Sequence, residues 1–158
     1  SLSAVLSARA ALSDLTPLLT DCGRLCGFAC CKGDEQTGML LFPGEEALFA
    51  PCAFGRVIPA HFELAGRPAH LFVCNGTCSR ENRPLACRLF PLFLHFKKDG
   101  SPHVKLEVRA KAVCPLCDYG VIGLRTEFVA AAKTAYAALM EDDECAAFLR
   151  ALDEAFSL

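Results

Sequence analysis

Eleven cysteines in a chain of 158 residues constrain this sequence more than any other feature. A chain of this length buries roughly two-thirds of its unfolded surface, so it builds a hydrophobic core without the disulfides that very small secreted domains need. The number of cysteines is odd, so complete pairing within one chain is excluded. In a reducing compartment, clustered thiols are typical of metal sites or catalytic sites. We therefore expect a metal site, with a redox dithiol and a disulfide framework as the alternatives.

Nine of the cysteines are clustered along the chain. They form three groups: Cys22, Cys26, Cys30 and Cys31; then Cys74, Cys78 and Cys87; then Cys114 and Cys117. A spacing of four on a helix puts side chains on one face, with Cβ atoms about 5–6 Å apart. The ligand sulfurs of a tetrahedral zinc site lie just under ~4 Å apart. Two thiolates with this spacing therefore converge on one metal ion or on two corners of an iron–sulfur cluster.

The adjacent pair Cys30 and Cys31 needs a separate account. Side chains of adjacent residues diverge on an extended backbone, so these two thiols are expected not to share one metal ion. One of them completes the first group. The other faces the core, a second site or the far side of a cluster. Which of Cys30 and Cys31 takes which position stays open.

The tightest pair, Cys114 and Cys117, is separated by two residues. This spacing occurs in zinc knuckles and in dithiol redox motifs. No βαβ pattern surrounds it, which favours a metal ligand over a thioredoxin-like dithiol. The two remaining cysteines, Cys52 and Cys145, stand alone in the sequence, and we expect both to be core residues.

Basic residues surround the second cysteine group, although the whole chain is slightly acidic. Four thiolates around Zn²⁺ leave a net charge of about −2, which guanidinium groups offset by hydrogen bonding to sulfur. Arg80, Arg83 and Arg88 are placed to do this, and a solvated basic loop is the alternative. None of the four histidines is paired with a cysteine at ligand spacing, so we expect structural or surface roles for His61, His70, His95 and His103.

Composition limits the partners of the chain. Apolar residues make up 53% and charged residues 22%, which is typical of a globular protein. A net charge of −2 and a pI of about 6.1 favour neither nucleic acid nor an anionic membrane as a partner. Apolar runs such as 38–42 are far shorter than the ~20 residues of a membrane span. Residues 1–12 lack the basic leader of a signal peptide, so we expect one cytoplasmic domain over 1–158.

Apolar periodicity predicts an α+β fold, mostly helical, with a small antiparallel hairpin or sheet. We expect a first helix whose apolar face carries Leu2, Val5, Leu6, Leu12 and Leu15. Thr16 and Pro17 are typical of an N-cap and a first helical position, and they predict a second helix through the first cysteine group.

The rest of the chain carries clear turn and helix signals. Residues 39–42 form a short apolar run, and run 71–73 predicts a buried strand. Pro43-Gly44-Glu45-Glu46 predicts a short helix through Phe49. Ranges 92–96 and 102–108 flank a turn at 97–100 and predict a hairpin. Residues 122–157 predict a pair of helices, packed within one chain or across a homodimer. The apolar faces of the two helices are expected to be Leu124, Phe128, Ala131, Ala135 and Leu139, then Cys145, Phe148, Leu149, Leu152 and Phe156, with Asp142 or Asp143 as the second N-cap.

Two stretches of the chain resemble the CxxCxxCC family of zinc- or iron-chelating proteins. The first runs from Cys22 to Cys31 and is followed by Phe42-Pro43-Gly44-Glu45-Glu46, and the second, from Cys78 to Pro91, is similar to the family's RPxxCRxxP element. Together they lie within residues 21–91. The family pattern separates its first cysteines by two residues, whereas three residues separate Cys22, Cys26 and Cys30. The resemblance implies zinc or iron binding, and the family's broad relatives include flagellin lysine-N-methylases.

We therefore expect a cytoplasmic protein that holds zinc or an iron–sulfur cluster through the nine clustered cysteines. The alternative is a metal- or cluster-dependent protein-modifying enzyme, with an activity similar to that of a lysine methylase. The sequence contains no glycine motif of the kind that binds S-adenosylmethionine, the cofactor that a methylase would need. The acidic pair Glu45 and Glu46 is best placed to assist such chemistry, but a helix N-terminus also explains it. A third alternative is a disulfide-rich binding module.

Overall fold

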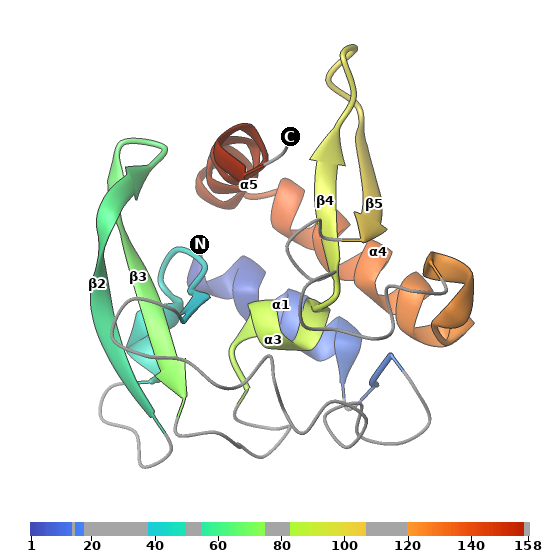
Figure 1. Cartoon of the computed structure of the whole chain (residues 1–158), viewed down its shortest axis with the longest axis horizontal. Helices are drawn as coiled ribbons and strands as arrows, with labels where there is room; N and C mark the ends of the chain where they lie inside the picture. The colour runs from blue at the N-terminus through green and yellow to red at the C-terminus, as the bar shows by residue number, and fades with distance from the viewer. Residues whose placement is uncertain (14, 18–37, 50–54, 75–82, 107–119, 157–158) are drawn as a thin grey trace.

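The computed structural model describes residues 1–13, 15–17, 38–49, 55–74, 83–106 and 120–156. Within these ranges the chain is an α+β fold with four helices and two small antiparallel sheets, which confirms the predicted class (Figure 1). In chain order the elements are α1 (Leu2–Leu12), β1 (Met39–Leu40), the short 3₁₀ helix η2 (Glu45–Leu48), β2 (Gly55–Leu64), β3 (Arg67–Cys74), α3 (Leu85–Leu89), β4 (Leu92–Phe96), β5 (Pro102–Leu106), the short 3₁₀ helix η6 (Val121–Gly123), α4 (Thr126–Met140) and α5 (Asp143–Phe156).

The larger sheet has the strand order β1-β3-β2. The predicted strand 71–73 falls in β3, and the first two residues of the apolar run 39–42 form β1, whereas β2 is a strand that the sequence pattern does not predict. Between the paired residues Leu64 and Arg67, Ala65 and Gly66 have φ angles of 53° and 75°. Positive φ at both central residues is the type I′ turn geometry that joins two twisted strands.

The smaller sheet is the predicted hairpin. Strand β4 pairs with β5 from Leu92 opposite Leu106 to Phe96 opposite Pro102. The prediction is confirmed for these strands, and residues 107–108 lie outside the described residues. The predicted turn closes where the Lys97 N–H donates to the Ser101 carbonyl at 2.9 Å. In Figure 1 this hairpin projects from the helices.

The predicted pair of C-terminal helices is confirmed as α4 and α5. Asp142 is the N-cap of α5, because its carboxylate accepts the N–H of Cys145 at 2.9 Å. The residues of the expected apolar faces are buried or partly buried wherever their side chains are described, but Leu124 precedes α4 and packs from outside the helix. Phe156 is the one expected residue whose side chain lies outside the description.

The first helix differs from its predicted form in two respects. Its buried face is Val5, Ala8 and Leu12, and Leu6 is 47% exposed. The prediction for Leu6 is wrong because successive residues lie about 100° apart on a helix, so Leu6 points away from the stripe that begins at Val5. The helix ends at Leu12, and Leu15 packs against the core from beyond it. Thr16 and Pro17, where the second helix was predicted to begin, are not helical, and the rest of that prediction lies outside the described residues.

Helix α1 lies at the centre of the fold and contacts α3 and α4. Helix α5 contacts α4, β4 and β2, and α3 also contacts β1. Figure 1 shows α1 and α3 between the three-stranded sheet and the side formed by α4 and the β4–β5 hairpin. Side chains from α1, α3, β4, α4 and α5 share the main hydrophobic core. No helix in the described ranges combines the length and the apolar character needed to cross a bilayer.

Candidate functional site

Two of the nine predicted metal ligands, Cys74 and Cys87, lie within the described residues. The structure therefore bears on the second cysteine group and its surroundings. The remaining predicted ligands lie outside the description: Cys22, Cys26, Cys30, Cys31, Cys78, Cys114 and Cys117. Cys52 and Arg80 also lie outside it, so the predictions made for them stay predictions.

Cys74 is the last residue of β3 and is partly exposed. It pairs with Gly55 at the start of β2 and packs against a small core of Leu41, Phe49 and Phe72. Gly55 is required by close approach, because a Cβ there would lie 2.3 Å from the Phe72 ring. The backbone of Cys74 is thus fixed by the sheet, directly before the segment that carries Cys78.

Cys87 lies in the middle of α3 and is also partly exposed. Leu85 and Leu89, two residues before and after it, are buried at 0% and 1% exposure. Two residues correspond to about 200° around a helix, so Cys87 lies on a different face from the two leucines. The leucines anchor α3 in the main core and leave the thiol at the boundary of the core.

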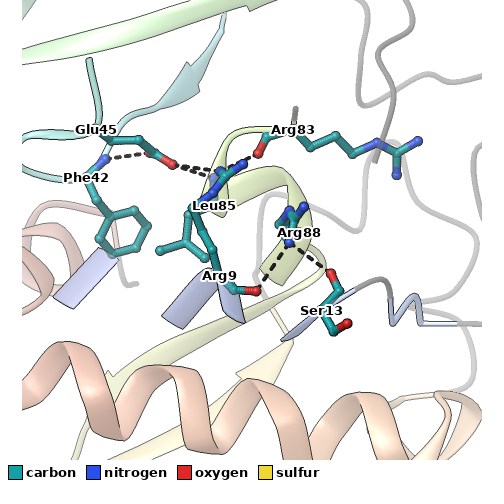
Figure 2. Close-up of polar contacts among 7 residues, drawn as sticks. All are labelled: Arg9, Ser13, Phe42, Glu45, Arg83, Leu85 and Arg88. Carbon is teal, nitrogen blue, oxygen red and sulfur yellow. Dashed lines mark hydrogen bonds and ion pairs between the residues drawn. The ribbon is translucent and has the colours of Figure 1, made fainter. Parts of the chain in front are cut away.

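Glu45 is the central polar group of this region and is completely buried. Its Oε1 accepts the N–H of Phe42 at 3.1 Å, and its Oε2 accepts the N–H of Leu85 at 2.7 Å. The Nη1 atom of Arg9, on α1, lies 3.4 Å from the same Oε2 (Figure 2). One carboxylate thus joins three segments that are distant in sequence: α1, the turn into η2, and the first turn of α3.

The backbone before Glu45 explains why η2 lies so close to α1. Gly44 has a φ of 85°, a left-handed conformation that glycine adopts without strain. A Cβ at Gly44 would lie 3.3 Å from both the backbone and the side chain of Leu2. The conformation therefore favours glycine, and the close approach of the two segments leaves little room for a side chain.

The guanidinium of Arg9 also fixes the chain before α3. Its Nη1 donates to the carbonyl of Arg83 at 2.6 Å. In Figure 2 the side chain of Arg83 extends away from this contact, so Arg83 joins the network through its backbone. Arg9 is mostly buried, and its cationic group lies 5.9 Å from the centre of the Phe49 ring.

Arg88 connects the other end of α3 to α1. Its Nη1 donates to the carbonyls of Ser13 at 2.9 Å and Arg9 at 3.3 Å. These carbonyls lie at the C-terminal end of α1, where a cation is favoured by the helix dipole. Its described hydrogen bonds thus stabilise the contact between α1 and α3. Arg88 directly follows Cys87 in sequence, and it was expected to offset the negative charge of a thiolate site there.

The electrostatics of Glu45 combine two opposed effects. Burial raises the pKa of the Glu45 carboxyl, because it removes the charged form from water. The N–H groups of Leu85 and Phe42 and the charge of Arg9 oppose that rise. Sequence reasoning explained Glu45 as a first-turn acid and missed these contacts. The local signal of a short helix N-terminus is the same whether the carboxylate is buried or exposed.

Cys145 behaves differently from the two partly exposed cysteines. It is completely buried in α5, which confirms the prediction that it is a core residue. Its Sγ contacts the carbonyl of Ser1 at 3.8 Å. Burial, together with the neighbouring Asp142, raises the pKa of Cys145 to about 12. A metal ligand is a thiolate, so the surroundings of Cys145 do not suit a metal.

The histidines have the structural and surface positions that the sequence predicts. His95 in β4 makes a hydrogen bond of 2.8 Å with Asp153 of α5, and its ring packs edge-on against His103 at a centroid distance of 5.1 Å. His61 is exposed, and His70 is partly buried in β3. Among the described residues, no three histidine, cysteine or acidic side chains are grouped closely enough to hold a metal ion.

No protein-family model, curated protein or solved structure matches this chain.

Proposed function

We propose that this chain is a cytoplasmic metal-binding protein that holds zinc or an iron–sulfur cluster through cysteine thiolates. The observation that carries the proposal is the clustering of nine cysteines into three groups. Thiolate ligation suits both zinc and iron–sulfur clusters. The resemblance to the CxxCxxCC family supports the same chemistry.

The contrast among the described cysteines gives the proposal structural support. Cys74 and Cys87 are partly exposed and directly flank the segment with Cys78. Cys145 is buried, and its raised pKa keeps it protonated. Of the cysteines assigned to the metal, Cys74 and Cys87 are thus reachable from outside the core, whereas Cys145, assigned to the core, is enclosed by it.

The enzyme alternative receives less support from the described residues. Glu45 was the best-placed acid for assisting a reaction, but its two oxygens are used by the backbone of Phe42 and Leu85 and by Arg9. A fully buried carboxylate with these contacts is not accessible to a substrate. Glu46 is partly exposed and keeps only the role of a first-turn acid.

Anaerobic purification of the whole chain, followed by elemental analysis and a visible absorption spectrum, tests the proposal. Stoichiometric zinc in a colourless protein identifies a zinc site. Iron with sulfide-to-iron charge-transfer bands identifies a cluster. Material that contains neither metal in stoichiometric amount, and gains none on reconstitution, refutes the proposal.

Three cysteine-to-serine variants test which cysteines are ligands. Cys87→Ser is expected to lower metal content and to destabilise the fold by several kcal/mol, about the order of a structural metal's contribution. Cys26→Ser is expected to do the same, whereas Cys145→Ser is expected to keep the metal because it changes a core thiol. Full metal content in Cys87→Ser with loss in Cys145→Ser would overturn the assignment.

A further inference from the structure

We infer that the buried Glu45–Arg9 pair, together with Arg88, is a positioning network that holds Cys87 in place for metal binding. The inference rests on the proposed function and adds residues that are not themselves ligands. It is carried by the hydrogen bonds that this network makes to both ends of α3 (Figure 2).

Helix α3 cannot fix Cys87 by itself. It has five residues, whereas isolated helices shorter than about 12–15 residues are marginal in water. Its position must come from contacts with the rest of the fold. The buried side chains of Leu85 and Leu89 supply apolar contacts, which hold the helix against the core but are not directional.

The polar contacts are directional and lie on both sides of the cysteine. Before Cys87, Arg9 holds the Arg83 carbonyl at 2.6 Å and Glu45 holds the Leu85 N–H at 2.7 Å. After it, the Arg88 side chain binds the end of α1 at 2.9 Å. The thiol thus lies between two points at which α3 is tied to other elements.

The chemistry of the pair suits this role. The planar guanidinium of Arg9 presents several N–H groups in a fixed arrangement, so it contacts the Arg83 carbonyl and the Glu45 carboxylate together. The two carboxylate oxygens of Glu45 take backbone N–H groups from two different segments. Metal–thiolate bonds require sulfur positions within a few tenths of an ångström, and loss of groups that orient ligands typically costs about 10–100-fold in affinity.

Glu45→Gln and Asp153→Asn form the matched test. Both remove one charge from a buried carboxylate that accepts a backbone N–H, but Asp153 lies between α5 and β4, away from α3. The whole protein is loaded with Zn²⁺ or Co²⁺, and release to a chromogenic chelator is followed at a temperature where both variants are folded by circular dichroism. We expect Glu45→Gln to release metal about 10–100-fold faster, and Asp153→Asn to stay within about twofold of the wild type.

The Co²⁺ spectrum separates a positioning role from general stability. Displacement of Cys87 weakens the thiolate-to-cobalt charge-transfer band, whereas loss of stability in a folded protein leaves it unchanged. If Glu45→Gln fails to fold, Arg9→Lys provides the same test, because lysine keeps the charge and loses the planar contact geometry.

The outcomes distinguish the two proposals. A wild-type protein that holds neither zinc nor iron overturns the proposed function and this inference together. A metal-loaded wild type, with release rate and Co²⁺ spectrum unchanged in Glu45→Gln or Arg9→Lys, overturns the inference alone. Equal acceleration in Glu45→Gln and Asp153→Asn also overturns it, because the effect would then follow stability and not the position of Cys87.

Discussion

Glu45 and Asp153 are both buried carboxylates that accept a backbone N–H from a distant part of the chain, yet their surroundings differ. Glu45 is completely buried, binds two backbone N–H groups and lies beside the always-charged Arg9. Asp153 is 7% exposed, binds the N–H of Phe96 at 3.1 Å and pairs with His95. One joins the short elements around Cys87, and the other joins the β4–β5 hairpin to α5.

The difference reflects how much apolar packing each region has. Helices α4 and α5 are long enough to bury continuous apolar faces, so Asp153 adds a contact to elements that packing already fixes. Around Glu45, η2 and α3 have four and five residues. Short elements bury few side chains, and we infer that hydrogen bonds to one carboxylate take over part of what packing does elsewhere.

The largest expected effect is that of Glu45→Ala. This change removes the acceptor of the N–H groups of Leu85 and Phe42 from a buried site, and it takes away the anionic partner of Arg9. Removal of one partner of a buried charged pair typically costs about 3–5 kcal/mol. The free energy of unfolding from urea titrations measures the loss, and amide hydrogen exchange should accelerate at Leu85 and Phe42. If Glu45→Ala lowered the free energy of unfolding by less than Asp153→Ala does, the contrast between the two carboxylates would be wrong.

Asp153→Ala is expected to cost less, about 1–3 kcal/mol, the price of one unsatisfied buried N–H. His95 is 27% exposed and can turn to water, so its loss of a partner adds little. Amide exchange should accelerate at Phe96, while Leu85 stays protected. Acceleration at both amides would show that the two regions unfold as one unit and do not respond separately.

The same contrast explains what the sequence could predict. Helices α4 and α5 and the β4–β5 hairpin follow from local signals: helical spacing, an N-cap and a turn at residues 97–100. Strand β2 lacks such a signal, because its side chains do not alternate cleanly between buried and exposed and Pro59 interrupts it.

The candidate site was predictable only in its cysteines. The grouping of the cysteines along the chain is read from their spacing alone and stays a prediction, but the burial of Glu45 involves Leu85, which is 40 residues further along the chain. No local pattern near Glu45 encodes that partner. Arg9 was visible as a charge within an apolar helix, but its contact with the Arg83 carbonyl spans 74 residues. Contacts at such separations come from tertiary packing, which periodicity does not report.

Asp142 gives a third carboxylate, with intermediate exposure. It accepts the N–H of Cys145 three residues further along and also lies 3.3 Å from the amino group of Ser1. Asp142→Ala removes the N-cap of α5 and is expected to cost about 1 kcal/mol. The N–H of Cys145 holds the pKa of Asp142 below its ordinary value of 3.8. A lowered folded-state pKa stabilises the fold above pH 3.8, and this contribution is lost as pH falls through the folded-state pKa. The difference between wild type and variant should therefore shrink in acid, and a difference that grows there would contradict this account.

The smallest effect is expected at the surface ion pair between Arg67 and Glu144. Arg67 is 66% exposed and Glu144 30% exposed, so water and salt compete with the contact. Exposed pairs contribute about 0–1 kcal/mol, and Arg67→Ala should lower the free energy of unfolding by less than about 0.5 kcal/mol. The change should vanish in high salt, whereas that of Glu45→Ala should persist because its site is buried. If the two variants lost equal stability and responded equally to salt, burial would not be what separates the carboxylates, and the special role of Glu45 would have to come from geometry alone.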